Sequence, residues 1–285
     1  MGSFSVLNNI AGINAQNQLN VNNVYLNRTL LRLSSGKRIN SGADDAAGLG
    51  IADSLRANVR AIDQAVRNAN DGISVAQIAD GALQEITNLL TRAFTLAEEA
   101  ATETVDSTGR TALNNEFTAI EAEVARIAGQ TNFNGLALFT TAGLNGALTV
   151  FVGDVSSSST IDVTVTSITT SGSTVTSLGG TDLTAVDLTS MSTAATALTT
   201  LKSALSGVST MRASIGAGMN RLQAAVAVLQ NQSQNTQAAE STIRDANMAE
   251  EIANLTKYQI LAQSGIAALS QANANSQLVL ALLRQ

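Results

Sequence analysis

The sequence predicts a mainly α protein: a long antiparallel helical coiled-coil rod with terminal interface helices and a small β-rich insertion. Three observations predict this fold. Apolar residues recur at alternating steps of three and four on both sides of the middle of the chain, which is coiled-coil spacing. Between about 138 and 190 the apolar residues alternate instead with period two, as in half-buried strands. The 285 residues include no proline, which permits long unbroken helices.

The two ends of the chain carry apolar stripes without acidic residues. No Asp or Glu precedes Asp44, and none follows Glu251. We expect a helix over roughly 5–33, with one stripe through Val24 and a second through Leu19 and Leu26. Two apolar faces interleaved with Asn and Gln indicate contacts on more than one side, including contacts with another chain. The predicted interface residues are Val6, Ile10, Ile13, Val24, Leu31, Ile252, Leu255, Ile266, Leu269, Leu280 and Leu283.

The first long helix is expected to begin after a break at 33–36. Ser41 is its predicted N-cap, with Asp44 and Asp45 near the first turn. Its seam is predicted to shift phase by one residue near Ala79. The seam residues are Leu55, Val59, Ile62, Val66, Ala69, Ile73 and Ala76, followed by Leu83, Ile86, Leu90, Ala93 and Ala97.

A shorter helix and a turn are predicted to precede the insertion. Residues 106–109 indicate a turn, and the helix after it buries a face that includes Phe117 and Val124. Gly129 is the expected C-cap of this helix, and residues 132–135 indicate a second turn.

The insertion at 138–190 is predicted to contain at least two strands, 148–152 and 161–165, with Ser/Thr-rich loops around them. Helix resumes near Met191, and its seam runs from Leu198 to Leu229 with one interruption at Arg212. The two long helices should pack antiparallel, which brings the chain ends together and leaves the insertion at the opposite end. We therefore expect terminal helices at 1–40 and 246–285, a rod domain at 41–137 and 191–245, and a surface insertion at 138–190.

Composition excludes most chemistry. Without His or Cys the chain has no catalytic triad, no Cys–His pair and no imidazole or thiolate metal site. Glu98, Glu99 and Glu103 are best interpreted as a solvated helix face, and no phosphate-binding loop occurs, so we predict no enzyme and no cofactor. The net charge of −6 argues against nucleic acid. The start lacks a cleavable signal pattern, and no apolar run is long enough to insert in a membrane.

Several motifs resemble those of one family. The segments LSSGKRINSGADDAAGL at 33–49, NANDGIS at 68–74 and GQTNFNG at 129–135 are similar to the N-terminal region of bacterial flagellin. The segments NRL at 220–222, ESTIRD at 240–245 and AN at 272–273, with the ending at 280–284, resemble its C-terminal region. The resemblance covers about 1–137 and 192–285.

This resemblance implies a secreted, extracellular subunit of the bacterial flagellar filament that polymerises with itself for swimming motility. It implies export through the flagellar type III apparatus and a helical polymer with the terminal segments at its core. The implied partners are an export chaperone at the C-terminal segment and the filament cap and hook-junction proteins.

The resemblance also implies a secondary role in innate immunity. The stretch of flagellins that contacts the Toll-like flagellin receptor corresponds to residues 89–101. Leu89 belongs to that stretch, Arg92 and Leu96 match its basic and leucine positions, and Glu116 matches a supporting glutamate. Phe94 stands where immunostimulatory members often carry a second arginine. The alternative is that Leu89 and Leu96 are filament contacts, and both interpretations can hold together.

Three other functions remain as alternatives at this point. A hook–filament junction adaptor shares the terminal-helix plan. An enzyme carried in the insertion would resemble flagellins that bear a protease domain, although only some fifty residues without His are present there. A type III translocator would insert in host membranes, which the amide-rich ends oppose.

Overall fold

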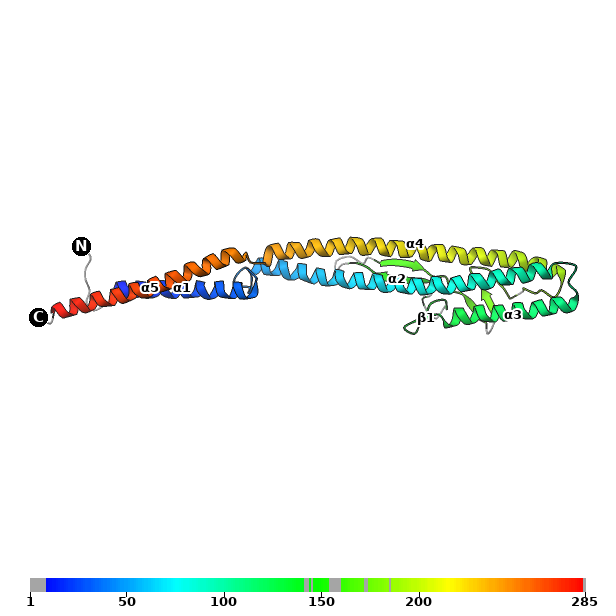
Figure 1. The fold of residues 1–285 in the computed structure, drawn as a ribbon, viewed down its shortest axis with the longest axis horizontal. Helices are drawn as coiled ribbons and strands as arrows, with labels where there is room; N and C mark the ends of the chain where they lie inside the picture. Colours follow the sequence, from blue (N-terminus) through cyan, green and yellow to red (C-terminus); the bar gives the residue numbers. More distant parts are fainter. Residues whose placement is uncertain are drawn as a thin grey trace. The chain divides into compact units, whose positions relative to one another are not determined.

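The structure is a computed structural model that describes residues 9–140, 144, 146–153, 160–171, 174–184 and 186–283, with the backbone alone at 174 and 276–283 (Figure 1). Its helices are α1 (Ile10–Ser35), α2 (Ala46–Ala100), α3 (Ser107–Gln130), α4 (Met191–Arg244) and α5 (Met248–Leu283). The chain divides into two compact units. Unit 1 comprises 1–57 and 235–285, and unit 2 comprises 58–234. The predicted mainly helical fold is confirmed.

In unit 1, α1 and α5 pack antiparallel, as Figure 1 shows. The contacts run in opposite order along the two helices. The Asn9 side chain donates to the carbonyl of Ala272 at 3.2 Å, the rings of Tyr25 and Tyr258 stack 5.5 Å apart, and Arg32 pairs with Glu251. The pairing of the two chain ends is therefore confirmed.

The connection between α1 and α2 is fastened to the connection between α4 and α5. Helix α1 ends where Gly36 adopts φ 70°, a conformation that glycine accepts without strain. The Arg38 backbone N–H donates to the carbonyl of Arg244 at 2.7 Å, and the N–H of Ala246 donates to that of Gly36 at 3.0 Å. These bonds hold the α1–α2 connection against the α4–α5 connection.

The prediction that Ser41 caps α2 was wrong. The side chain of Asp45 accepts from the N–H of Gly48 at 2.8 Å, which is N-cap geometry, and α2 begins at Ala46. Ser41 instead donates its N–H and hydroxyl to Asp44, whose own N–H bonds back to the Ser41 carbonyl. Because residues 41–44 form this turn, α2 begins about one helical turn later than predicted.

In unit 2, α2 and α4 run antiparallel and side by side (Figure 1). Asp63 accepts from Ser233 at 2.9 Å, and Asp80 pairs with Arg212 at 2.8 Å. Residue numbers therefore increase along α2 in the direction in which they decrease along α4. Arg212 lies beside the seam rather than within it, because the neighbouring Met211 is 4% exposed and fills that position.

The predicted phase shift near Ala79 does not exist. One row of buried positions in α2 continues in unbroken steps of three and four, and several of its members are small residues that do not stand out as apolar in the sequence. In α2 this row is Ile62, Ala65, Ala69, Gly72, Ala76, Ala79, Leu83, Ile86, Leu90, Ala93, Ala97 and Ala100, and Ala52, Val75 and Leu96 are buried as well. In α4 the buried residues are Ala194, Ala197, Leu201, Ala204, Val208, Met211, Ile215, Gly218, Leu222 and Leu229.

Helix α3 begins earlier and ends later than expected. Asp106 is its N-cap and accepts from the N–H of Gly109, so part of the predicted turn is already helix. Gly129 is interior, and the C-cap is Thr131, whose N–H bonds to the Ile127 carbonyl. The predicted turn at 132–135 is a tight hairpin between β1 (Asn132–Phe133) and β2 (Leu136–Ala137), with φ of 50° and 81° at its two central residues.

The insertion contains the two predicted strands, β3 (Ala147–Phe151) and β4 (Thr160–Thr164), paired antiparallel. A second hairpin, β5 (Thr169–Ser171) and β6 (Thr174–Ser177), was not predicted because its Ser/Thr-rich strands lack apolar alternation. The Ser156–Ser159 loop lies outside the described residues.

The insertion does not sit at the far end of the helix pair, contrary to expectation. Val150 lies against Gly72 in the middle of α2, and Val163 lies against Gly218 in α4. The backbone of Gly179 touches Gly207, also in α4. The strands therefore pack along the sides of the long helices, where glycines leave room for them.

Candidate assembly surface

The described residues contain no group of three or more His, Cys, Asp or Glu side chains arranged to hold a metal ion. Glu98, Glu99 and Glu103 are exposed to solvent. Within the described ranges, no helix combines the length and hydropathy needed to cross a bilayer. The surface that stands out is apolar rather than chemically reactive.

Most of the predicted interface residues on α1 and α5 point into solvent. Ile10, Val24 and Leu31 are 61, 60 and 60% exposed, and Ile13, Ile252 and Ile266 are also exposed. Leu255 and Leu269 are half-buried. Burial of one such side chain contributes about 1.5–3 kcal/mol, so this face favours contact with another molecule. Val6 lies outside the described residues, and the side chains of Leu280 and Leu283 are not described.

The two stripes of the first segment have different roles. The stripe containing Leu19, Leu26 and Leu33 is half-buried, and Leu19 approaches Gly265 on α5. The other stripe remains exposed. The predicted interface residues omit other exposed apolar side chains of α1 and α5. These are Val21, Tyr25, Leu30, Met248, Ile260 and Leu261.

Charged side chains brace unit 1 where the helices connect. Arg28 and Arg32 approach Asp44 at 3.5 and 4.0 Å, and Arg32 also pairs with Glu251 at 3.4 Å. Burial would raise the pKa of Asp44, but the N–H groups of Asn40 and Ser41, the Ser41 hydroxyl and the Arg32 charge outweigh it. The pKa of Asp44 is consequently lowered.

This cluster is not fully satisfied by hydrogen bonds within the described residues. The Nε atom of Arg32 and the Oε2 atom of Glu251 are buried without a hydrogen-bond partner among these residues. Glu251 as a residue is only 7% exposed. A buried charge depends strongly on the partners it has, so the Arg32–Glu251 pair makes the α1–α5 contact sensitive to any change at either residue.

The residues implied as receptor contacts lie in unit 2, at α2 and α3. Arg92 and Glu116 form an ion pair with N–O distances of 2.7 and 2.9 Å, and their side chains are 58 and 45% exposed. Leu89 is half-buried, and Leu96 is 1% exposed within the core. Phe94 is half-buried against the same core. Of the four residues, Arg92 and Glu116 are the two that offer an exposed side chain.

The fold and this surface define a class of protein: a mainly helical protein whose paired chain ends expose apolar faces. The chain matches the bacterial flagellin N-terminal helical region over residues 6–143 and the bacterial flagellin C-terminal helical region over residues 198–283. It belongs to the bacterial flagellin family.

Individual relatives agree with this assignment. The chain is 38% identical over 276 residues to a flagellin of Halalkalibacterium halodurans, covering 97% of this chain and 98% of the relative. The crystal structure of Bacillus cereus flagellin is similar with a TM-score of 0.50 and 30% identity, covering 61% of this chain and 94% of that one. A proposed flagellar hook-associated protein from Vibrio parahaemolyticus shares the fold, with a TM-score of 0.58, 13% identity, and 71% and 100% coverage.

The chain is therefore a structural, non-enzymatic subunit that polymerises with copies of itself into the extracellular flagellar filament. The likeness to the hook-associated protein, at 13% identity, concerns the fold alone. The near full-length match to a flagellin favours the filament subunit over the junction adaptor.

Proposed function

We propose that the exposed face of the α1–α5 pair is the surface through which flagellin subunits meet in the filament core. The observation that carries this proposal is the row of exposed large apolar side chains on both helices, Val24 and Ile266 among them. The terminal stretches that carry most of this face, before Asp44 and after Glu251, contain no acidic side chain. Neighbouring copies can thus approach it without burying negative charge.

In this proposal the terminal segments 1–40 and 246–285 form the filament core, and 41–137 with 191–245 form the surrounding helical layer. The insertion at 138–190 contributes the variable surface. An export chaperone would cover the C-terminal segment before assembly, since that segment carries part of the apolar face. The cap and hook-junction proteins would meet the same face at the two ends of the filament.

Deleting residues 252–285 tests the proposal. The truncated chain should remain a monomer that keeps the helices of unit 2 and fails to polymerise on seeds. A sharper comparison uses Val24→Asp and Val228→Asp, since both valines are exposed, at 60 and 64%, but Val228 lies in unit 2. Val24→Asp should abolish filament growth, and Val228→Asp should leave most of it. Filaments formed by the truncation or by Val24→Asp would refute the proposal.

A second proposed role is recognition of the free monomer by the Toll-like flagellin receptor. It rests on the exposed Arg92–Glu116 pair, which presents a basic and an acidic group side by side from two helices. Leu96 would support Arg92 from beneath rather than touch a receptor, because its side chain is buried. A monomer pull-down with the receptor ectodomain tests this role, and no binding would reject it.

A further inference from the structure

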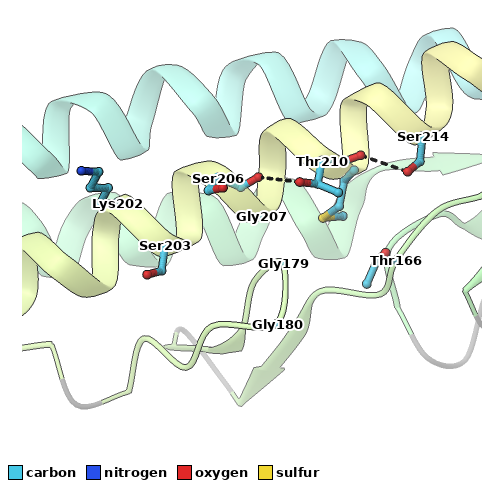
Figure 2. A pocket seen from close by; sticks show the side chains of 10 residues that line it. Thr166, Gly179, Gly180, Lys202, Ser203, Ser206, Gly207, Thr210 and Ser214 are labelled. Carbon is cyan, nitrogen blue, oxygen red and sulfur yellow. Dashed lines mark hydrogen bonds between the residues drawn. The ribbon is translucent and has the colours of Figure 1, made fainter.

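An open groove runs along α4 in unit 2, between that helix and the insertion (Figure 2). Its volume is about 660 Å³. One wall is a face of α4, and the other wall is formed by Thr166 and the Gly179–Gly180 turn. The α4 wall consists of Lys202, Ser203, Ser206, Gly207, Thr210, Met211 and Ser214.

The walls of this groove are held in place by backbone contacts. The Gly179–Gly180 turn is closed by reciprocal bonds between Leu178 and Thr181, at 2.9 and 3.0 Å. Gly179, with φ 59°, lies so close to Gly207 that a Cβ on either residue would meet the other backbone at 2.6 Å. Two glycines thus bring the turn against α4 and fix the position of this wall.

The described residues that line the groove include one charged group, Lys202, and no carboxylate. Ser203, Thr210 and Ser214 donate their hydroxyl protons to carbonyls of their own helix at 3.0 Å, as Figure 2 shows for the last two. Lys202 is exposed, and within the described part of the chain it has no ion-pair partner. The groove therefore offers an unneutralised ammonium on a chain whose net charge is −6.

A complementary surface occurs at the C-terminal end of α2. Glu98 and Glu99 occupy the last turn of this helix, and Glu103 follows it; all three are exposed. None of the three forms an ion pair with a residue that the structure describes. The guanidinium of Arg110 donates to the carbonyls of Ala100 and Thr102 at this helix end, at 2.9 and 3.1 Å, and leaves the three carboxylates free for a cation from another molecule.

We propose that the groove beside Lys202 receives the acidic end of α2, residues 98–103, from a second copy of this chain. This inference rests on the self-assembly of the protein, and it assigns a specific lateral contact in unit 2, apart from the α1–α5 surface. Lys202 can pair with one of the three carboxylates, and the open groove leaves the other two in contact with solvent. The contact is weakened by salt because both partners are exposed.

Charge reversal tests this contact. Lys202→Glu should raise the critical concentration for seeded filament growth about two- to fivefold, the range expected for an exposed ion pair. Glu99→Lys should raise it similarly, and the double variant should restore a value near that of the unaltered chain. Arg221→Glu is the matched control, because Arg221 is exposed on the same helix and its change alters net charge equally. It should polymerise normally.

Cysteine cross-linking supplies an independent measurement, since the chain has no native cysteine. A chain with Ser206→Cys and Glu103→Cys should give a ladder of covalent oligomers with a short bis-maleimide in filaments but not in monomers. Normal polymerisation of Lys202→Glu, equal loss in Arg221→Glu, failure of the double variant to recover, or no ladder would each overturn the contact. Failure of the α1–α5 proposal would show separately, as filament growth by Val24→Asp.

Discussion

Arg32 on α1 and Glu251 on α5 form an ion pair of 3.4 Å across 219 residues of sequence. Glu251 is the last acidic residue of the chain, and its side chain is 9% exposed. The pair joins the two terminal helices next to their connections to α2 and α4. Loss of the carboxylate would leave the Arg32 guanidinium partly buried beside Asp44 alone.

We expect Glu251→Gln to destabilise the α1–α5 pair by about 2 kcal/mol, because a buried charge then loses its partner. The measurement is amide hydrogen exchange of α1 and α5, together with the temperature at which filaments dissociate. Glu250→Gln serves as the control, since Glu250 is exposed one residue earlier. Equal behaviour of the two variants would contradict a specific role of the ion pair.

Two glycines of α4 give a matched test of the contact between the insertion and this helix. A Cβ at Gly218 would lie 2.8 Å from both γ-methyl groups of Val163, whereas a Cβ at Gly216 meets no atom within 4 Å. Gly218→Ala should therefore cost about 1–3 kcal/mol through overpacking. Gly216→Ala should stabilise the helix by up to about 1 kcal/mol. Urea unfolding of the monomer measures both, and two changes of the same sign would contradict the seating.

Glu121 makes the attachment of the β5–β6 hairpin to α3 depend on pH. Its carboxylate accepts from the N–H of Val175 at 3.1 Å. Burial raises the pKa of Glu121 above its ordinary value of 4.5, although the Val175 bond opposes this. The folded state thus favours the protonated acid, and this contribution to stability is present below pH 4.5 and lost as pH rises through the raised pKa.

Glu121→Gln should therefore be more stable than the unaltered protein at pH 7, because the amide keeps the acceptor oxygen and removes the charge. The difference should disappear as the pH falls below 4.5. Urea unfolding between pH 4 and 7 measures it, with the exposed Glu98→Gln as the control. A difference that grows on acidification would contradict the assigned direction.

Arg92→Ala should weaken binding of the monomer to the Toll-like receptor ectodomain about tenfold, as expected when a central charged contact is removed. Filament growth should be less affected. Arg67→Ala, another exposed arginine of α2 in unit 2, should bind the receptor normally. Surface plasmon resonance with both variants makes the comparison, and unchanged binding by Arg92→Ala would remove Arg92 from the proposed site.

The sequence predicted helices and their pairing well, since the three-four spacing of apolar residues depends on helix geometry alone. It failed where small residues carry the structure. Ala65, Gly72 and Ala79 complete the seam of α2 but have little side chain to reveal it. Gly72 and Gly218 also receive the insertion, and no local pattern shows which glycine faces a neighbour.

Caps were misplaced for a different reason. Several Ser and Asp residues near a helix start can each serve as the N-cap. Ser41 and Asp44 bond to each other in a local turn, and Asp45 is left to accept from the N–H of Gly48 at the start of α2. Among the interface residues, the sequence identified the exposed stripe, but only the structure showed which stripe α5 covers.

The stacked rings of Tyr25 and Tyr258 have a practical consequence. These are the only tyrosines of a chain without tryptophan, and both lie in unit 1. Near-ultraviolet circular dichroism and tyrosine emission therefore report almost solely on the terminal helices, whereas far-ultraviolet signals report on the helices of both units. The two tyrosines are therefore an intrinsic spectroscopic probe, with which the ordering of the two chain ends can be followed during filament growth without any added label.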